Sequence, residues 1–392
     1  MMRRDLLVLA VALAAPLLAR YTFFSPEGSF TVEVSLENAG NMRLPMYRNA
    51  ITSLEVVGDH AIGGTAADDG LAPFLFAVSL SKRRLETVYP LERLLPGQRS
   101  IQSGFGRGAD GTLFAGTMPG RQGQSGRLIA VRLRQGALAV EDLGVPVPGE
   151  GVFALSCDAK RGALYGISHP SGKFFAFRMG DRHTDVYEAT ATTRRETGYL
   201  GEYAITPEDY LSRRVVIDSR GRVYGSRPGG KLFRFDPATR QMETLPEGLP
   251  EVWGRNPLGR VDAWAVAPDG SLYGGNAGDG QLFRLDPETG KVTNLGKPAM
   301  MPRLQGLAFD RHGALWGVTG APPGYTHLFR YTPDRGFIDY GNPNFPMVAP
   351  GLEQGIAWRG FHIGAVAASE DGRYIVLGET EALSQLMVFP VD

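Results

Sequence analysis

The chain has 392 residues, 43% of them hydrophobic, and its 41 Lys and Arg residues are balanced by 41 Asp and Glu residues. A net charge of zero argues against a general nucleic-acid or anionic-membrane binder. Cys157 is the only cysteine, so the chain has no internal disulfide, and the sequence contains no CxxC, HExxH or EF-hand spacing typical of zinc or calcium sites.

The N-terminus carries the features of an export signal. Arg3 and Arg4 precede an apolar run over residues 6–19, which is shorter than the about 20 residues that a membrane-spanning helix needs. We expect residues 1–19 to be a signal peptide of the general or the twin-arginine type, and residues 20–392 to form one domain in the periplasm or outside the cell. Once the signal is cleaved, we expect no stable insertion into a membrane.

A unit made of a short strand, a Gly-bearing turn and further strands recurs along the chain. The two clearest copies run over residues 215–237 and 265–287 and share the pattern Gly-x-Leu-Phe-Arg-x-Asp-Pro at 230–237 and 280–287. Five looser copies centre on other glycines, and the seven centres in chain order are Gly63, Gly116, Gly166, Gly225, Gly274, Gly317 and Gly378. Repeats of this kind indicate a fold built from one unit used many times.

Each copy is long enough for four short antiparallel strands. Pairs such as Asp110-Gly111 and Asp269-Gly270 suit tight hairpins, because glycine adopts positive φ without a steric clash. The repeats therefore predict an all-β, seven-bladed β-propeller of four-stranded antiparallel blades. Six or eight blades are the alternatives, since the first and last copies are the weakest.

Closure of such a ring requires one more strand. The alternating segment 29–35 reads as a strand, and the last copy ends near residues 386–389. We expect the N-terminal strand to pair into the last blade as its outer strand, because that pairing removes two open sheet edges. A free N-terminal arm is the alternative.

The fold predicts where a site would lie. In a propeller blade the inner strand begins on the face where the second strand ends, so the residues at these positions gather around one mouth of the central channel. The residues there that we expect to bind substrate are polar and mostly basic: Arg48, Asn49, Gln102, Arg213, Arg227, Arg260, Arg303 and Gln305. The candidate catalytic residues are His169, Tyr210, Arg214 and His362. The alternative is that these side chains are only solvated or structural, because loops face water in any propeller.

Arginine, histidine and tyrosine together provide the functional groups that β-elimination on a uronic acid requires. The planar guanidinium binds a carboxylate through two hydrogen bonds and makes the C5 proton more acidic. A histidine or tyrosine removes that proton, and another protonates the leaving oxygen at C4. We therefore expect an acidic oligosaccharide or polysaccharide as the partner, no nucleic acid, and a monomeric protein. A glycoside hydrolase at the same mouth is an alternative enzyme.

The repeat wording at 230–239 and 280–289 resembles that of exported bacterial seven-bladed propellers. Among these, the His, Tyr and Arg mouth resembles the propeller polysaccharide lyases that cleave ulvan-type or rhamnose–glucuronate linkages. This resemblance implies that His169, Tyr210 or His362 act as acid and base, and that Arg214 neutralises the uronate. It also implies a structural zinc site in some members, for which this sequence offers no ligand set.

A weaker resemblance is to the gluconolactonase and virginiamycin-lyase propellers. It implies axial carboxylate, amide or histidine groups, often with a divalent metal, and the candidates here are Glu150, Asp262, Asn276 and Glu379. We expect that no cofactor is required, with a divalent metal such as calcium or zinc as the alternative. A third hypothesis is a non-catalytic scaffold that binds glycan or protein at the same mouth.

Overall fold

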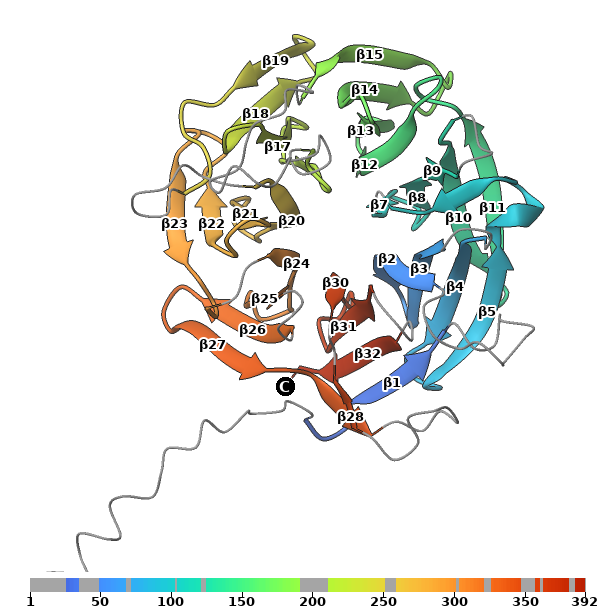
Figure 1. Cartoon of the computed structure of the whole chain (residues 1–392), viewed down its shortest axis with the longest axis vertical. Helices are drawn as coiled ribbons and strands as arrows, with labels where there is room; N and C mark the ends of the chain where they lie inside the picture. The colour runs from blue at the N-terminus through green and yellow to red at the C-terminus, as the bar shows by residue number, and fades with distance from the viewer. Residues whose placement is uncertain are drawn as a thin grey trace, which may run out of the picture.

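Seven blades of four antiparallel strands stand around one axis in the computed structural model (Figure 1), as the repeats predict; six are separate four-stranded sheets, and the first is part of a six-stranded sheet. The structure describes residues 26–34, 49–67, 72–102, 104–120, 125–190, 211–250, 259–300, 303–320, 326–346, 357–359, 362–380 and 385–391. The predicted signal peptide, residues 1–19, lies outside these ranges.

The strands of each blade follow one another from the axis outward. The first three blades are β2 (Asn49–Val57), β3 (His60–Ala67), β4 (Phe74–Ser79) and β5 (Arg84–Pro90); β7 (Gly106–Arg107), β8 (Leu113–Gly116), β10 (Leu128–Arg134) and β11 (Ala137–Gly144); and β12 (Gly151–Asp158), β13 (Ala163–His169), β14 (Lys173–Arg178) and β15 (Thr184–Ala189).

The remaining blades have the same order. They are β16 (Val216–Ile217), β17 (Val223–Arg227), β18 (Lys231–Asp236) and β19 (Gln241–Thr244); β20 (Val261–Val266), β21 (Leu272–Asn276), β22 (Leu282–Leu285) and β23 (Val292–Gly296); β24 (Leu304–Phe309), β25 (Leu315–Thr319), β26 (His327–Thr332) and β27 (Gly336–Gly341); and β30 (Ile363–Ala368), β31 (Tyr374–Glu379), β32 (Gln385–Pro390) and β1 (Phe30–Glu33).

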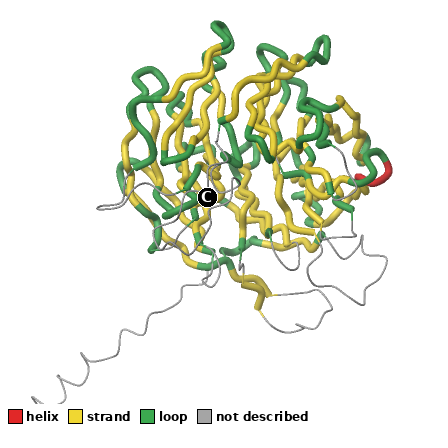
Figure 2. Tube along the Cα trace, turned by 45° about the horizontal axis from the view of Figure 1, so that its top comes forward, coloured by secondary structure: helices red, strands yellow, loops and turns green. Residues whose placement is uncertain are grey.

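A few short elements lie outside this scheme. Strand β6 (Gln98–Ser100) pairs with β3 and β9 (Met118–Pro119), and β28 (Asn344–Pro346) pairs with β29 (Ala357–Arg359). One 3-10 helix, Leu91–Arg93, stands out among the strands and loops in Figure 2. No helix of the described residues is long and apolar enough to span a membrane.

The glycine at the centre of each repeat lies on the second strand of its blade. In the fifth blade, Gly274 pairs in register with Phe283 of the third strand, and a methyl group added to Gly274 would overlap that ring. Gly225 stands in the same relation to Phe233, and Gly317 to Phe329. In these three blades the glycine therefore makes room for a fully buried phenylalanine, which explains why the two residue types occur together there.

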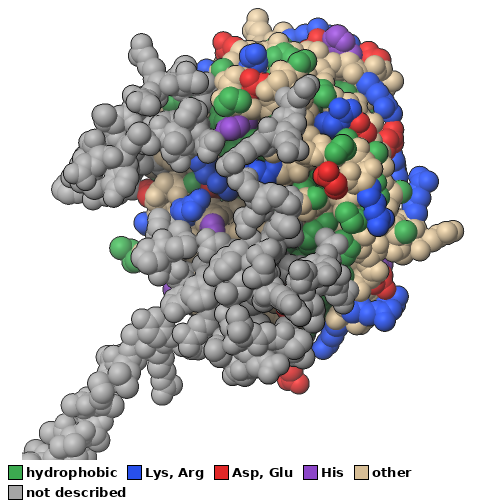
Figure 3. Space-filling view, turned by 45° about the vertical axis from the view of Figure 1, so that its right-hand side comes forward, with side chains coloured by type: hydrophobic (Ala, Val, Ile, Leu, Met, Phe, Trp, Pro, Cys, Tyr) green, Lys and Arg blue, Asp and Glu red, His purple; other side chains and the backbone are tan. Residues whose placement is uncertain are grey.

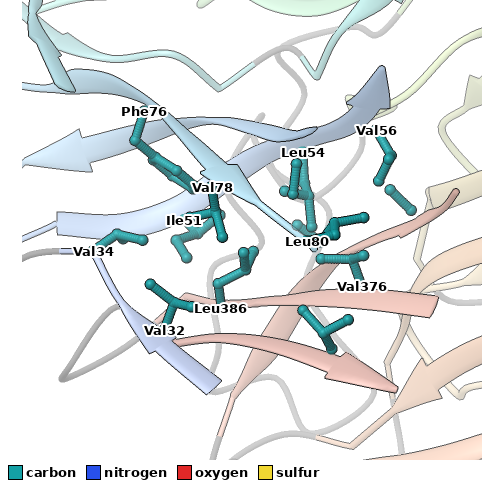
Figure 4. Packing of buried hydrophobic residues seen from close by; sticks show 14 of the residues in the cluster. Val32, Val34, Ile51, Leu54, Val56, Phe76, Val78, Leu80, Val376 and Leu386 are labelled. Carbon is teal, nitrogen blue, oxygen red and sulfur yellow. The ribbon is translucent and has the colours of Figure 1, made fainter. Parts of the chain in front are cut away.

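The ring closes as predicted, by pairing of the N-terminal strand with the last blade. Strand β1 runs antiparallel to β32, with Val32 opposite Leu386. Figure 4 shows these two residues packed with Ile51 and Val78 of the first blade in one buried cluster. Chain segments from both ends of the sequence thus share one core, and β32 is not left as an open edge of the last blade.

The packing of the repeat glycines predicts a specific destabilisation. Gly274→Ala should lower the free energy of unfolding by about 1–3 kcal/mol, because the added methyl group overpacks the blade against Phe283. The matched control is Gly180→Ala, at an exposed position with no atom close to the added methyl group. Urea unfolding measures both, and equal effects of the two changes would contradict the packing account.

Candidate functional site

A cavity of about 270 Å³ lies where the inner strands begin, at one mouth of the central channel. Its polar lining comes from several blades and includes Thr52, Gln102, Arg213, Arg214, Asp262, Gln305, His362 and Thr380. On the outer surface, by contrast, basic and acidic side chains are interspersed (Figure 3). The mouth therefore gathers arginines, although the whole chain is neutral.

Asp262 holds the arginines on one side of the cavity. Its carboxylate accepts a hydrogen bond of 2.5 Å from Nε of Arg260, and it lies 3.9 Å from Nε of Arg213. Asp262 and Arg260 are 3% and 6% exposed, so each of the two buried charges is compensated by the other. Arg260 is thus a buried partner of Asp262, whereas Arg213 lies at the cavity wall.

Arg214 lies deeper, between the mouth and the channel below it. Its guanidinium donates to the carbonyl of Thr52 at 3.5 Å and packs so closely on Gly104 that a side chain there would overlap it. Burial lowers the pKa of Arg214, and the nearby carboxylates of Glu55 and Asp262 oppose this effect. Arginine stays charged in such a site, so a fixed cation forms part of the cavity floor.

Glu55 lies in the channel, and its carboxylate interacts electrostatically with the guanidinium of Arg214. Burial raises the pKa of Glu55 to about 6, while a hydrogen bond from the amide of Val56 and the charges of Arg107 and Arg214 act in the opposite direction. The sequence analysis missed this residue, although a charged side chain within the apolar run of β2 was the signal for it.

His362 is held firmly at the mouth. Its Nε2 lies 3.0 Å from Oε1 of Gln305, and its backbone carbonyl accepts hydrogen bonds from the amide and the hydroxyl of Thr380 at 2.8 Å and 3.1 Å. Burial lowers the pKa of His362 to about 4, helped by the positive charges of Arg303 and Arg213. The imidazole is therefore neutral at pH 7 and can accept a proton.

The structure brings five of the predicted site residues together at the cavity: Gln102, Arg213, Arg214, Gln305 and His362. Arg303, at the start of the sixth blade, acts on His362 through its charge. Thr380, which anchors the backbone of His362, was not predicted, because nothing in the repeat pattern distinguishes it.

Other predicted residues lie elsewhere or outside the described part. His169 stacks on Phe153 with ring centroids 5.7 Å apart and is not among the described residues that line the cavity. Arg227 donates to Thr244 on the outer strand of its own blade and to Glu188 on the outer strand of the third blade. Arg48 and Tyr210 lie outside the described residues, and so does the side chain of Asn49 at the start of β2.

The four residues considered as metal ligands bind separate partners. Glu150 accepts from the amide of Ser171, Glu379 from the amide of Gln385, and the side-chain oxygen of Asn276 from the amide of Gly278. The fourth, Asp262, is enclosed by arginines. In the described ranges, no three His, Cys, Asp or Glu side chains gather where they could hold a metal ion. This set does not fit a shared divalent cation.

Comparison with known proteins relates the chain to others by fold. No family model matches the sequence, and no curated protein matches it. A solved streptogramin B lyase has a TM-score of 0.61 with 10% identity, covering 93% of this chain and 98% of its own. Virginiamycin B lyase from Staphylococcus aureus has a TM-score of 0.61 with 11% identity, covering 93% and 99%.

Two further structures extend the comparison. A catalytically inactive histidine-to-alanine variant of the S. aureus lyase, solved with quinupristin, has a TM-score of 0.61 with 9% identity, covering 93% of this chain and 100% of its own. The extracellular domain of a putative hybrid two-component system from B. thetaiotaomicron has a TM-score of 0.57 with 15% identity, covering 94% and 42%. These likenesses show the seven-bladed fold, and they include lyases. Nothing in them supports the ulvan or rhamnose–glucuronate resemblance.

The electrostatics of the mouth predict how His362 responds to a loss of charge. Arg303→Gln should raise the pKa of His362 from about 4 toward its usual value of 6.5, because a nearby positive charge that disfavours protonation is removed. NMR titration of the imidazole ring measures this pKa. Arg234→Gln, on the outer part of the fourth blade, is the control and should leave it unchanged. An unaltered pKa in the Arg303 variant would contradict the account.

Proposed function

We propose that the protein is a carbon–oxygen lyase that cleaves glycans containing uronic acid by β-elimination at the mouth cavity. The observation that carries the proposal is the placement of a neutral histidine, His362, in one cavity with two arginines, Arg213 and Arg214. A base and a pair of carboxylate-binding groups are the minimum that this reaction requires.

The reaction divides into steps that these residues can perform. Arg213 and Arg214 bind the C6 carboxylate and stabilise the negative charge that develops on it when C5 loses its proton. His362 takes that proton, the C5–H electron pair becomes the C4=C5 double bond, and the C4–O bond breaks. The leaving oxygen then takes a proton, for which Tyr210 remains the predicted donor.

The neutrality of His362 suits a base, since a protonated imidazole could not accept the C5 proton. Its pKa of about 4 in the free protein makes it a weak base. A bound carboxylate would offset the arginine charges and raise this pKa, so the base would strengthen only when substrate is present. The low-pH limb of kcat/KM should therefore lie near pH 4, and that of kcat at higher pH.

The structural comparisons support a lyase in general terms. The virginiamycin B lyases share the fold, and one of them is catalytically inactive when a histidine is replaced by alanine. This likeness also favours a second candidate, which is an elimination lyase acting on a carbonyl substrate that is not a carbohydrate. A non-catalytic scaffold would use the same arginines to bind an acidic glycan without turning it over.

Replacement of the base separates these functions. His362→Gln should lower kcat/KM by about 10²- to 10⁴-fold, because the general base is lost while the arginines remain. The assay follows the ultraviolet absorbance of unsaturated uronate on a panel of glucuronate- and iduronate-containing glycans. His183→Gln, at an exposed histidine bonded to Asp185, is the matched control and should retain full activity.

The outcomes point to different proteins. Sugar release without a rise in absorbance would replace the lyase with a hydrolase. Glycan binding without turnover would support the scaffold. Turnover that survives in His362→Gln would remove this histidine from the mechanism.

A further inference from the structure

We infer that Gln305 is a positioning residue, which holds the neutral imidazole of His362 with its proton on Nε2 and its acceptor lone pair on Nδ1. Gln305 then orients the base, a role different from the substrate binding that the sequence predicts. The assignment of the tautomer is independent of the proposed function. The further step, that Nδ1 receives the proton of the substrate, rests on it.

The orientation of the Gln305 amide follows from its second partner. The side-chain nitrogen of Gln305 lies 3.1 Å from the backbone carbonyl of Gly320, which can only accept a hydrogen bond. The amide nitrogen must therefore face Gly320, and the amide oxygen must face His362. A flipped amide would place two acceptor oxygens against each other.

The tautomer of His362 follows in turn. The amide oxygen of Gln305 can only accept, so Nε2 of His362, 3.0 Å away, must carry the proton and donate it. A neutral imidazole has one protonated nitrogen, and the lone pair is then on Nδ1. When Nδ1 takes a proton, Nε2 remains a donor to Gln305. The same hydrogen bond persists in both protonation states, so no side chain has to rotate during proton transfer.

Gln305 is itself rigidly held. It is 7% exposed, and Gly320, to which its amide donates, also donates its own amide to the carbonyl of Arg303 at 3.1 Å. The start of β24 is thus fastened twice to the end of β25. Close packing completes the arrangement, because a methyl group on Gly364 would press on both Gln305 and Thr380. A side chain fixed in this way can transmit a fixed orientation to its partner.

The charged groups around His362 come from three different blades. Arg303 and Arg213 disfavour its protonation, and Asp262 favours it. Gln305 adds no charge, so it can select the tautomer without altering this balance. A glutamate at the same place would alter it.

The direct test is the tautomer of His362 in the full-length protein, read from its ring nitrogens by ¹⁵N NMR at pH 7. We expect a protonated Nε2 and an unprotonated Nδ1. In Gln305→Met, which conserves volume but removes the acceptor, the signals should shift toward a mixture of the two tautomers. Gln281→Met is the control, since it changes another buried glutamine, which is bonded to Asp279 in the fifth blade. A proton on Nδ1 in the unaltered protein, or an unchanged tautomer in Gln305→Met, would overturn the inference.

A second variant tests the link to activity. Gln305→Glu restores an acceptor that carries a negative charge, so it should keep the proton on Nε2 and raise the pKa of His362 by about 1–2 units. The low-pH limb of kcat/KM should move upward by the same amount, whereas a merely structural defect would lower activity at every pH. A limb that stays in place while the NMR pKa moves would overturn the role of Nδ1 in the reaction.

The two proposals fail in different ways. If the tautomer is as expected but His362→Gln remains active, the proposed lyase mechanism is wrong and the positioning by Gln305 stands. If His362→Gln is inactive but the tautomer is the opposite one, the histidine is catalytic and the positioning by Gln305 is wrong.

Discussion

The pairing of β1 with β32 joins the two ends of the chain into one ring, and the position of every other element depends on it. Val32 and Leu386 are opposite each other in that pairing and share a core with the first blade. Without it, β32 would be an open edge of the last blade, and the core that the first and last blades share would lose Val32. Because the ring is closed, the starts of the inner strands converge on one mouth, so residues far apart in the sequence meet there.

The mouth is also shaped by the need to keep buried charges compensated. Asp262 forms ion pairs with Arg260 and Arg213, and the carboxylate of Glu55 lies near Arg214. These carboxylates compensate the positive charges of arginines that lie close to one another. His362 is neutral, because burial and the charges of Arg303 and Arg213 lower its pKa. The cavity therefore combines fixed positive charge with an uncharged base, a combination that suits an anionic substrate.

Much of the architecture could be predicted from the sequence, because the repeated glycines, the alternating N-terminal segment and the order of strands in a blade each have a direct structural meaning. The glycine at the centre of each repeat marks the second strand of a blade, and in blades such as the fifth it makes room for a phenylalanine, Phe283. The strand predicted over residues 29–35 closes the ring. The rule that inner strands begin at one mouth correctly placed Arg213, Gln305 and His362 at a common cavity.

The side-chain contacts could not be predicted, because the repeat shows where along its strand a residue lies but not which residue of another strand or blade it contacts. Arg227 ends its strand at a position like that of other mouth residues, yet Glu188 and Thr244 draw its side chain outward. Gln305 was expected to bind substrate, and its contacts with Gly320 and His362 depend on a neighbouring strand and a neighbouring blade. Glu55 was not predicted because it lies within β2 and not at the start of an inner strand, and only the folded ring shows that Arg214 lies near it.

The central claim is that the mouth cavity binds a carboxylate beside a neutral histidine. It is tested most directly by NMR titration of the histidine ring signals with glucuronate at pH 7. The account predicts that the signals of His362 shift to saturation while those of His183 stay in place, and that the pKa of His362 rises in the complex. Binding that leaves the His362 signals unmoved, or no binding at all, would contradict it.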